Sequence, residues 1–177
     1  MYKDKKFRIR GLEEIFADIQ DVYEQVGDRV RRIFLADGDA LVIPTDQLKE
    51  ILGKLRETFP SAERITSYGA PKDVANKSDA ELKALKDSGL DMVYIGLESG
   101  DNGVLHHVKK GVDAEEIIES VRRLKAAGIQ TSVTLISGLG GKERLREHSL
   151  HLRFHADPVF DDQDEGAGFQ KWRQQFP

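Results

Sequence analysis

The 177-residue sequence contains no cysteine, only two methionines and a single tryptophan. Without cysteine, this chain forms no disulfide and offers no thiolate to a zinc ion or an iron–sulfur cluster. It also lacks any apolar run near the roughly 20 residues of a membrane span, and its start lacks the apolar core of a secretory signal. We therefore expect a cytoplasmic protein with no membrane partner.

A surplus of basic charge is missing as well. The 27 lysines and arginines face 31 aspartates and glutamates, for a formal net charge of −4, and the two signs are interleaved along the chain. Nucleic-acid-binding proteins carry clustered basic charge, so no nucleic-acid partner is indicated. With 39% hydrophobic and 33% charged residues, the composition is that of one globular domain with a core.

Four short runs rich in β-branched and aromatic residues predict strands, at residues 32–36, 64–68, 91–97 and 129–136. Between them, apolar residues recur at the three- and four-residue spacing of amphipathic helices, within residues 12–26, 48–55 and 117–124. Strands that alternate with helices in this way are typical of right-handed βαβ units. The predicted class is α/β with a parallel sheet.

Helix boundaries are indicated by local motifs. Two pairs have the spacing of a capping box, namely Ser78 with Glu81 and Asp113 with Glu116. Gly89 and Gly128 follow the helices that these two capping boxes would begin, at positions where helix-ending glycines are common. The alternating pattern decays after about Leu145, so we expect an incomplete fold at that end.

Histidines and nucleophiles provide no catalytic or metal site. His148, His151 and His155 would share one helical face, but no cysteine or carboxylate is spaced to complete a metal site, and solvated histidines are the better interpretation. The pair His106 and His107 is interpreted in the same way. No nucleophile elbow is present, so no catalytic triad is predicted.

Ligands of parallel α/β folds collect at the carboxyl ends of the strands. The first predicted strand leads into Asp37-Gly38-Asp39-Ala40, where a glycine between two carboxylates lets backbone approach a ligand while an acid meets an ammonium or a hydroxyl. The alternative is an ordinary turn with solvent-facing acids.

Two further strand ends are distinctive. The third strand ends in Gly96-Leu97-Glu98-Ser99-Gly100, which suits Glu98 to accept hydrogen bonds from ribose hydroxyls; the alternative is a helix-capping turn. The fourth ends in Ser137-Gly138-Leu139-Gly140-Gly141, whose glycines present bare backbone to a flat base or a phosphate; the alternative is a tight turn.

Taken together, residues 34–41, 94–100, 108–111 and 135–141 resemble the radical S-adenosylmethionine (radical SAM) superfamily. The most similar branch contains the oxygen-independent coproporphyrinogen oxidases, the elongator-type enzymes and the methylthiotransferases. The resemblance covers about residues 1–144 and implies a partial parallel (β/α) barrel, an incomplete version of the family's (β/α)6 core. Residues 145–177 are expected to form an atypical tail, frameshifted or disordered.

The resemblance also implies cofactors. In this family S-adenosylmethionine sits on a [4Fe–4S] cluster, which cleaves it reductively to a 5′-deoxyadenosyl radical. Gly38 and Asp39 match the segment that binds the methionine amino group, Glu98 matches the position facing the ribose, Ile136 to Gly140 match the segment beside the adenine, and Tyr68 lies at the floor of the site. The implied cofactor-binding residues are Asp37, Gly38, Asp39, Tyr68, Glu98, Ser99, Ile136, Gly138, Leu139 and Gly140.

The family's CxxxCxxC loop is absent, and Met1-Tyr2-Lys3 resembles the residues that follow its third cysteine. We therefore expect a catalytically incompetent fragment of a radical SAM enzyme that cannot ligate the cluster. The alternative is a non-catalytic module that binds S-adenosylmethionine or another nucleotide. Missing barrel strands would expose sheet edges, which predicts self-association or aggregation. The substrate is not indicated.

Overall fold

The computed structural model describes residues 8–141, apart from the side chain of Asp37. Four strands form one sheet: β1 (Arg32–Asp39), β2 (Arg64–Tyr68), β3 (Met92–Glu98) and β4 (Gln130–Leu135). All neighbouring pairs are parallel, which confirms the predicted α/β class. β1 extends to Asp39 rather than ending at Ala36. The predicted tail of residues 145–177 and its three histidines lie outside the described residues.

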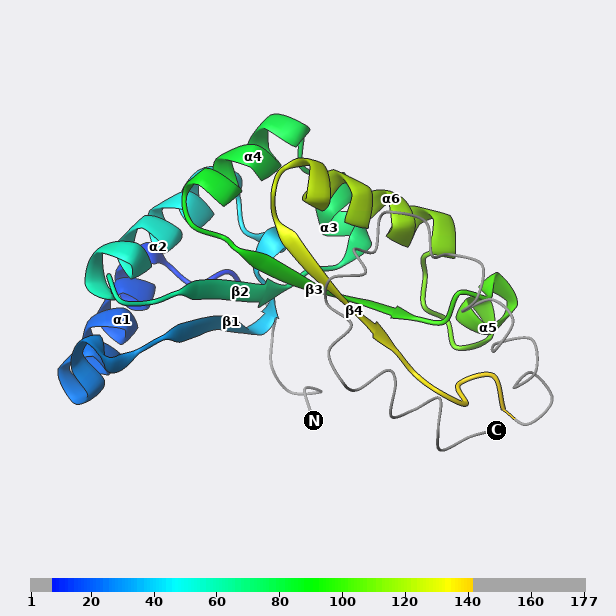
Figure 1. Ribbon diagram of the computed structural model, residues 1–177, viewed down its shortest axis with the longest axis horizontal. Coiled ribbons are helices and arrows are strands. Elements are labelled where there is room, and N and C mark those ends of the chain that lie inside the picture. The colour runs from blue at the N-terminus through cyan, green and yellow to red at the C-terminus, as the bar shows by residue number, and fades with distance from the viewer. Residues whose placement is uncertain (1–7, 142–177) are drawn as a thin grey trace.

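The strand order is β1-β2-β3-β4, so each strand pairs with the next one along the chain (Figure 1). A doubly wound sheet would reverse its order at a switch point, whereas a barrel adds strands in sequence. The predicted partial parallel β/α barrel is therefore confirmed. Within residues 8–141, β1 and β4 each pair with a single strand.

The strands are joined by helices α1 (Leu12–Val26), α2 (Thr45–Thr58), α3 (Pro71–Ala75), α4 (Asp79–Asp87), α5 (Asn102–His107) and α6 (Ala114–Ala126), with short 3-10 turns η1 (Gly27–Arg29) and η2 (Ala40–Val42). Helices α2, α4 and α6 lie along one side of the sheet (Figure 1). Their apolar faces and the sheet enclose a core that includes Leu48, Leu52, Ile65, Leu82, Leu85, Ile95 and Leu124. None of the described helices has the length and apolar character of a membrane span.

The predicted helix boundaries hold. Both capping boxes form with reciprocal hydrogen bonds, at Ser78 with Glu81 and at Asp113 with Glu116. Gly89 (φ 112°) and Gly128 (φ 82°) reverse the chain after α4 and α6 in conformations that favour glycine. The helices α3 and α5 escaped prediction because segments of five and six residues are too short for an apolar period to emerge.

The second face of the sheet carries three aromatic rings from adjacent strands. Successive side chains of a strand point to opposite faces, so Ile33 and Ile65 turn towards the helices while Phe34 and Tyr68 turn away. The ring centroid of Phe34 lies 4.9 Å from that of Tyr68 and 5.8 Å from that of Tyr94. These rings line the concave side of the partial barrel, which leads to the strand ends.

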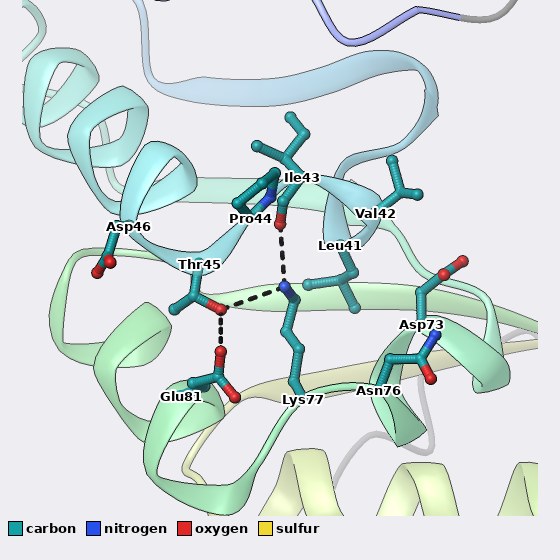
Figure 2. A pocket seen from close by; sticks show the side chains of 10 residues that line it. All are labelled: Leu41, Val42, Ile43, Pro44, Thr45, Asp46, Asp73, Asn76, Lys77 and Glu81. Carbon is teal, nitrogen blue, oxygen red and sulfur yellow. Dashed lines mark hydrogen bonds between the residues drawn. The ribbon is translucent and has the colours of Figure 1, made fainter.

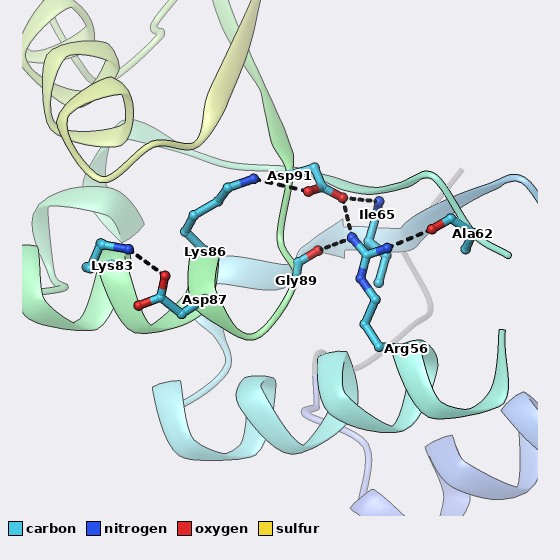
Figure 3. A network of polar contacts seen from close by, with 8 residues as sticks. All are labelled: Arg56, Ala62, Ile65, Lys83, Lys86, Asp87, Gly89 and Asp91. Carbon is cyan, nitrogen blue, oxygen red and sulfur yellow. Dashed lines mark hydrogen bonds and ion pairs between the residues drawn. The ribbon is translucent and has the colours of Figure 1, made fainter. Parts of the chain in front are cut away.

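At the amino ends of β2 and β3, Arg56 and Asp91 organise a polar network (Figure 3). Arg56 donates to Asp91 and to the carbonyl oxygens of Ala62 and Gly89. Asp91 also accepts from Lys86 Nζ at 3.1 Å and from the backbone amide of Ile65 at 2.8 Å. Burial opposes ionisation of Asp91, but these donors outweigh it and lower its pKa below 3.8. The network fastens α2 to the sheet at the edge remote from the predicted ligand site.

Candidate functional site

The predicted site lies at the carboxyl ends of the strands, and at β1 the backbone bulges. The pairing advances from Leu35 to Asp39 on β1 while it advances only from Ser67 to Tyr68 on β2. The intervening segment, which includes Asp37 and Gly38, is thereby looped out of the ladder. Gly38 has φ 131°, and a Cβ added there would meet no atom within 4 Å. The backbone at Gly38 is therefore open to close approach by a ligand.

Asp39 ties two neighbouring strand-end loops together. Its Oδ1 accepts from the amide of Leu41 at 2.8 Å, which caps η2, and its Oδ2 accepts from the amide of Ala70, in the loop after β2. The pKa of Asp39 is raised to about 6, mainly by burial and also by the Asp73 carboxyl, against the lowering effect of the two amides. Both carboxylate oxygens are thus engaged by backbone amides.

Glu98 ends β3 in a left-handed conformation, with φ 66°. Its Oε1 lies 2.5 Å from Nζ of Lys110, which follows α5, and the side chains are 27% and 20% exposed. A Cβ on Gly96 would lie 3.1 Å from the lysine nitrogen and 3.2 Å from the glutamate oxygen. The glycine thus makes room for a half-buried ion pair. A non-glycine residue at positive φ carries strain, which is common at binding sites.

The helix-capping alternative for this turn applies to a different residue. Asp101, not Glu98, caps α5 by accepting from the amide of Val104 at 3.1 Å. Ser99 is fully buried, and its hydroxyl accepts from the amide of Asp101 at 3.1 Å. The side chain of Ser99 therefore shapes the turn, and the Glu98 side chain pairs with Lys110 instead of capping α5.

The end of β4 joins Glu98 directly, because the amide of Ile136 donates to the carbonyl of Glu98 at 3.0 Å. Ile136 is 42% exposed, and Gly138, at φ 81°, has open space where a Cβ would stand. Leu139 and Gly140 follow, partly buried, in a turn closed by a bond from the Gly141 amide to the Gly138 carbonyl at 3.0 Å. An exposed apolar side chain and bare backbone thus follow the end of β4, which is bonded to the backbone of Glu98.

Tyr68 is the predicted site residue at the end of β2. Its side chain is 56% exposed and packs edge-on against Phe34. It also pairs in register with Asp39 on β1 and with Tyr94 on β3. The structure therefore links Asp39 to Tyr68 and Glu98 to Ile136 on one edge of the sheet, as the positions at the strand ends predicted.

A cavity of about 560 Å³ with a mixed polar and apolar lining lies beside this edge, lined by residues 41–46 together with Asp73, Asn76, Lys77 and Glu81 (Figure 2). Lys77 is only 7% exposed and donates to the Ile43 carbonyl at 3.0 Å and to the Thr45 hydroxyl at 3.3 Å. The Thr45 hydroxyl in turn donates to Glu81 at 2.7 Å. Burial lowers the pKa of Lys77.

Sequence reasoning missed Lys77, Asp73 and the pairing of Lys110 with Glu98. Contacts over such separations in the chain leave no spacing signal. Lys77 meets its partners through the packing of two βα units, and Lys110 meets Glu98 through the folding of the long β3–α6 connection. The one available hint was the motif Lys109-Lys110-Gly111, a basic pair before a glycine of positive φ. Among residues 8–141, no group of three histidine, aspartate or glutamate side chains gathers in a way that could hold a metal ion.

Comparison with known proteins agrees with this architecture. A heme chaperone, HemW, of Lactococcus lactis is 25% identical over 65% of this chain and 30% of that protein. A putative methylthiotransferase of Methanocaldococcus jannaschii is 23% identical over 89% of this chain and 35% of that protein. The chain thus spans about a third of the length of these curated relatives.

Among solved structures, the FeFe-hydrogenase maturase HydG from Carboxydothermus hydrogenoformans superposes with a TM-score of 0.62, at 22% identity, over 89% of this chain and 35% of that one. At this identity the similarity shows the fold. The family model described as the radical SAM superfamily matches residues 2–152. With its parallel sheet of consecutive strands and a polar site at their carboxyl ends, this chain belongs to the radical SAM superfamily.

Proposed function

We propose that the carboxyl edge of the sheet binds S-adenosylmethionine, as part of a radical SAM enzyme. The observation that carries the proposal is the half-buried Glu98–Lys110 ion pair, set between the open backbone at Gly38 and the exposed Ile136. Membership of the superfamily supports it, because the family's chemistry begins with this cofactor.

The donor and acceptor groups fit the cofactor. A carboxylate accepts from two vicinal hydroxyls, so Glu98 suits the ribose. The ammonium of Lys110 suits the carboxylate of the methionine moiety, and Ile136 with the backbone of Gly138 to Gly140 suits the flat adenine. The exposed backbone at Gly38 suits the methionine ammonium, and the exposed ring of Tyr68 lines the floor.

The residues present do not fit the iron–sulfur cluster. Full-length members hold a [4Fe–4S] cluster on three thiolates, and these 177 residues contain no cysteine. We therefore propose that this chain alone does not cleave S-adenosylmethionine reductively, because it has no ligands for the electron donor. Thiolates for a cluster would have to come from residues other than these.

Titration calorimetry of the full chain with S-adenosylmethionine tests the binding proposal. Glu98→Gln keeps the size of the side chain but removes its charge, and should weaken binding about 10-fold or more, because a charge-assisted bond contributes about 1.5–3 kcal/mol. Glu57→Gln, an identical change at an exposed position on α2, is the matched control and should bind normally. Absence of binding at millimolar cofactor would refute the proposal.

A second candidate is a non-catalytic module that binds S-adenosylmethionine or another nucleotide through the same edge. The complete absence of cysteine, together with a formed strand-end site, favours it. Anaerobic reconstitution followed by iron and sulfide analysis tests the premise that both candidates share. A cluster in stoichiometric amount would contradict the second candidate and the claim of incompetence, whereas binding without a cluster would agree with both.

We also propose that the chain self-associates through its sheet edges. Within residues 8–141, β1 and β4 each have an edge with unpaired backbone groups, which can pair with another copy. Sedimentation velocity at increasing concentration should show species larger than the 19.9 kDa monomer. A single monomeric boundary at all concentrations would exclude this.

A further inference from the structure

The concave face of the sheet carries a continuous aromatic surface, formed by the rings of Phe34, Tyr68 and Tyr94 on three adjacent strands. The ring centroids lie 4.9, 5.8 and 6.2 Å apart. Phe34 is 41% exposed, Tyr68 is 56% exposed and Tyr94 is half-buried. Helices α2, α4 and α6 lie on the opposite face of the sheet and leave the rings open (Figure 1). Exposed aromatic rings that adjoin one another, rather than being scattered, are typical of a binding surface.

Two arginines border this aromatic surface. Arg32 and Arg64 are register partners on β1 and β2, at the amino ends of the strands. The next residues, Ile33 and Ile65, turn towards the helices, so the two arginine side chains belong to the same face as Phe34. The concave face therefore combines an apolar middle with two positive charges at one end.

Neither guanidinium of this arginine pair makes an ion pair or a side-chain hydrogen bond within residues 8–141. The acids nearest to them along the chain are engaged elsewhere. Asp28 accepts two hydrogen bonds from the loop before β2, and Glu63 lies 4.0 Å from Arg31. Like charges on neighbouring strands repel each other, and an anion bound between them would remove the repulsion. The arginine pair thus favours a ligand with a negative group.

A carboxylate suits this pair, because guanidinium groups bind carboxylates through paired hydrogen bonds. An aromatic ring suits the middle of the face, since aromatic rings attract one another at centroid distances of about 4.5–7 Å. A cationic ligand would be repelled by the arginines, and a purely apolar one would leave them unpaired. We propose that the concave face binds a small aromatic carboxylate, with its ring on the aromatic surface and its carboxylate on Arg32 and Arg64.

Tyr68 joins this surface to the site at the strand ends, because it pairs in register with Asp39. A molecule on the aromatic surface is therefore a neighbour of whatever the strand ends bind. The consequence that small aromatic carboxylates are the class of substrate rests on the function proposed above, whereas the binding itself does not.

Ligand-observed NMR of the full chain with 2-naphthoate and with 2-naphthamide tests the proposal. The two probes share one ring system and are similar in size, but only naphthoate carries a charge. Naphthoate should bind saturably, and naphthamide should bind about 10-fold more weakly or worse, because it cannot form charge-assisted bonds with the arginines. This comparison uses the wild-type chain, so it does not depend on the folding of any variant.

Variants locate the site. Arg32→Gln/Arg64→Gln should abolish the preference for naphthoate and leave the binding of naphthamide unchanged. Arg31→Gln is the matched control, because it makes the same change in an adjacent residue whose side chain is 66% exposed and lies near Glu63. It should bind both probes normally. Tyr68→Leu should weaken both probes, since it removes the most exposed ring of the aromatic surface.

Equal affinity for the two probes in wild type would overturn the proposal. Naphthoate binding that Arg32→Gln/Arg64→Gln leaves unchanged would do so too, as would the absence of binding at millimolar naphthoate. These titrations contain no S-adenosylmethionine. Their failure would leave the cofactor proposal standing, and failure of the calorimetry would leave this one standing.

Discussion

The ammonium of Lys110 lies 2.5 Å from a carboxylate oxygen of Glu98, although the first residue follows α5 and the second ends β3. The Lys110 and Glu98 side chains are only 20% and 27% exposed, so each charge depends on the other for compensation. Removal of one partner leaves the other as an unpaired, largely buried charge. The site also loses the group that was removed, which is the donor Lys110 or the acceptor Glu98.

Lys110→Met should destabilise the fold by about 1–3 kcal/mol, since it leaves the Glu98 carboxylate unpaired. The double variant Glu98→Gln/Lys110→Met should recover part of this loss, because no charge then remains without a partner. Urea denaturation of the two single variants and the double variant measures the coupling. Strict additivity of the single effects would show that the ion pair contributes nothing.

Ser67→Ala should stabilise the chain by about 1 kcal/mol. The Ser67 hydroxyl is fully buried and is the one buried side-chain polar atom of residues 8–141 that has no hydrogen-bond partner, so its removal ends a desolvation cost. Ser120→Ala is the contrasting control, because that buried hydroxyl bonds to the carbonyls of Glu116 and Pro71. The midpoint temperature of thermal unfolding should rise for Ser67→Ala and fall for Ser120→Ala.

Arg56→Met should lower the free energy of unfolding by about 2 kcal/mol, because it removes three hydrogen bonds and the nearest cation from Asp91. Lys83→Met breaks the solvent-exposed Lys83–Asp87 pair of α4, and should cost less than about 0.5 kcal/mol. Urea unfolding midpoints of the two variants compare a half-buried pair with an exposed one. Equal effects would contradict the role assigned to the network.

The same network predicts a pH effect of defined sign. The pKa of Asp91 is lowered in the folded chain, so its stabilising contribution is present above the ordinary value of 3.8 and is lost as the pH falls through the lower folded-state value. Asp91→Asn should therefore flatten the decline in stability below pH 4. Parallel acid-unfolding curves for Asp91→Asn and wild type would argue against this assignment.

Gly38→Ala and Gly53→Ala should change stability in opposite directions. Gly38 has φ 131°, which an alanine side chain disfavours, so the cost should be about 1–3 kcal/mol and cofactor binding should weaken. Gly53 lies inside α2 with open space at its Cβ position, so alanine should stabilise by about 0.5–1 kcal/mol. Thermal unfolding and calorimetry of the two variants make the comparison.

Local patterns predicted most of the fold. Strands and long helices follow from apolar periodicity, and the capping boxes at Ser78 and Asp113 follow from short-range hydrogen bonding, so both are visible in one dimension. The end of β1 was placed too early, because Asp37, Gly38 and Asp39 have turn chemistry. The bulge that keeps Asp39 in the ladder depends on its partner Tyr68.

The candidate site was predictable only as a set of positions. The strand-end rule placed Asp39 and Glu98 on one edge of the sheet, but it could not show what each carboxylate contacts. Asp39 is engaged by the amides of Leu41 and Ala70, whereas Glu98 pairs with Lys110. Ala70 comes from the loop of the next βα unit, and Lys110 comes from the far end of the long β3–α6 connection. The approach of these two partners is set by packing rather than by spacing.

The consecutive order of the strands has a consequence for biosynthesis. Since each strand pairs with the one made just before it, the sheet can grow in the direction of translation, without waiting for a distant segment to emerge from the ribosome. The Asp39–Ala70 bond marks one step of this growth, because it cannot form until the second βα unit is synthesised. The first strand-end loop would thus gain its final shape only when its neighbour arrives. Nascent chains arrested while residue 70 is still inside the ribosome and chains arrested after it has emerged should differ in protease sensitivity at this loop.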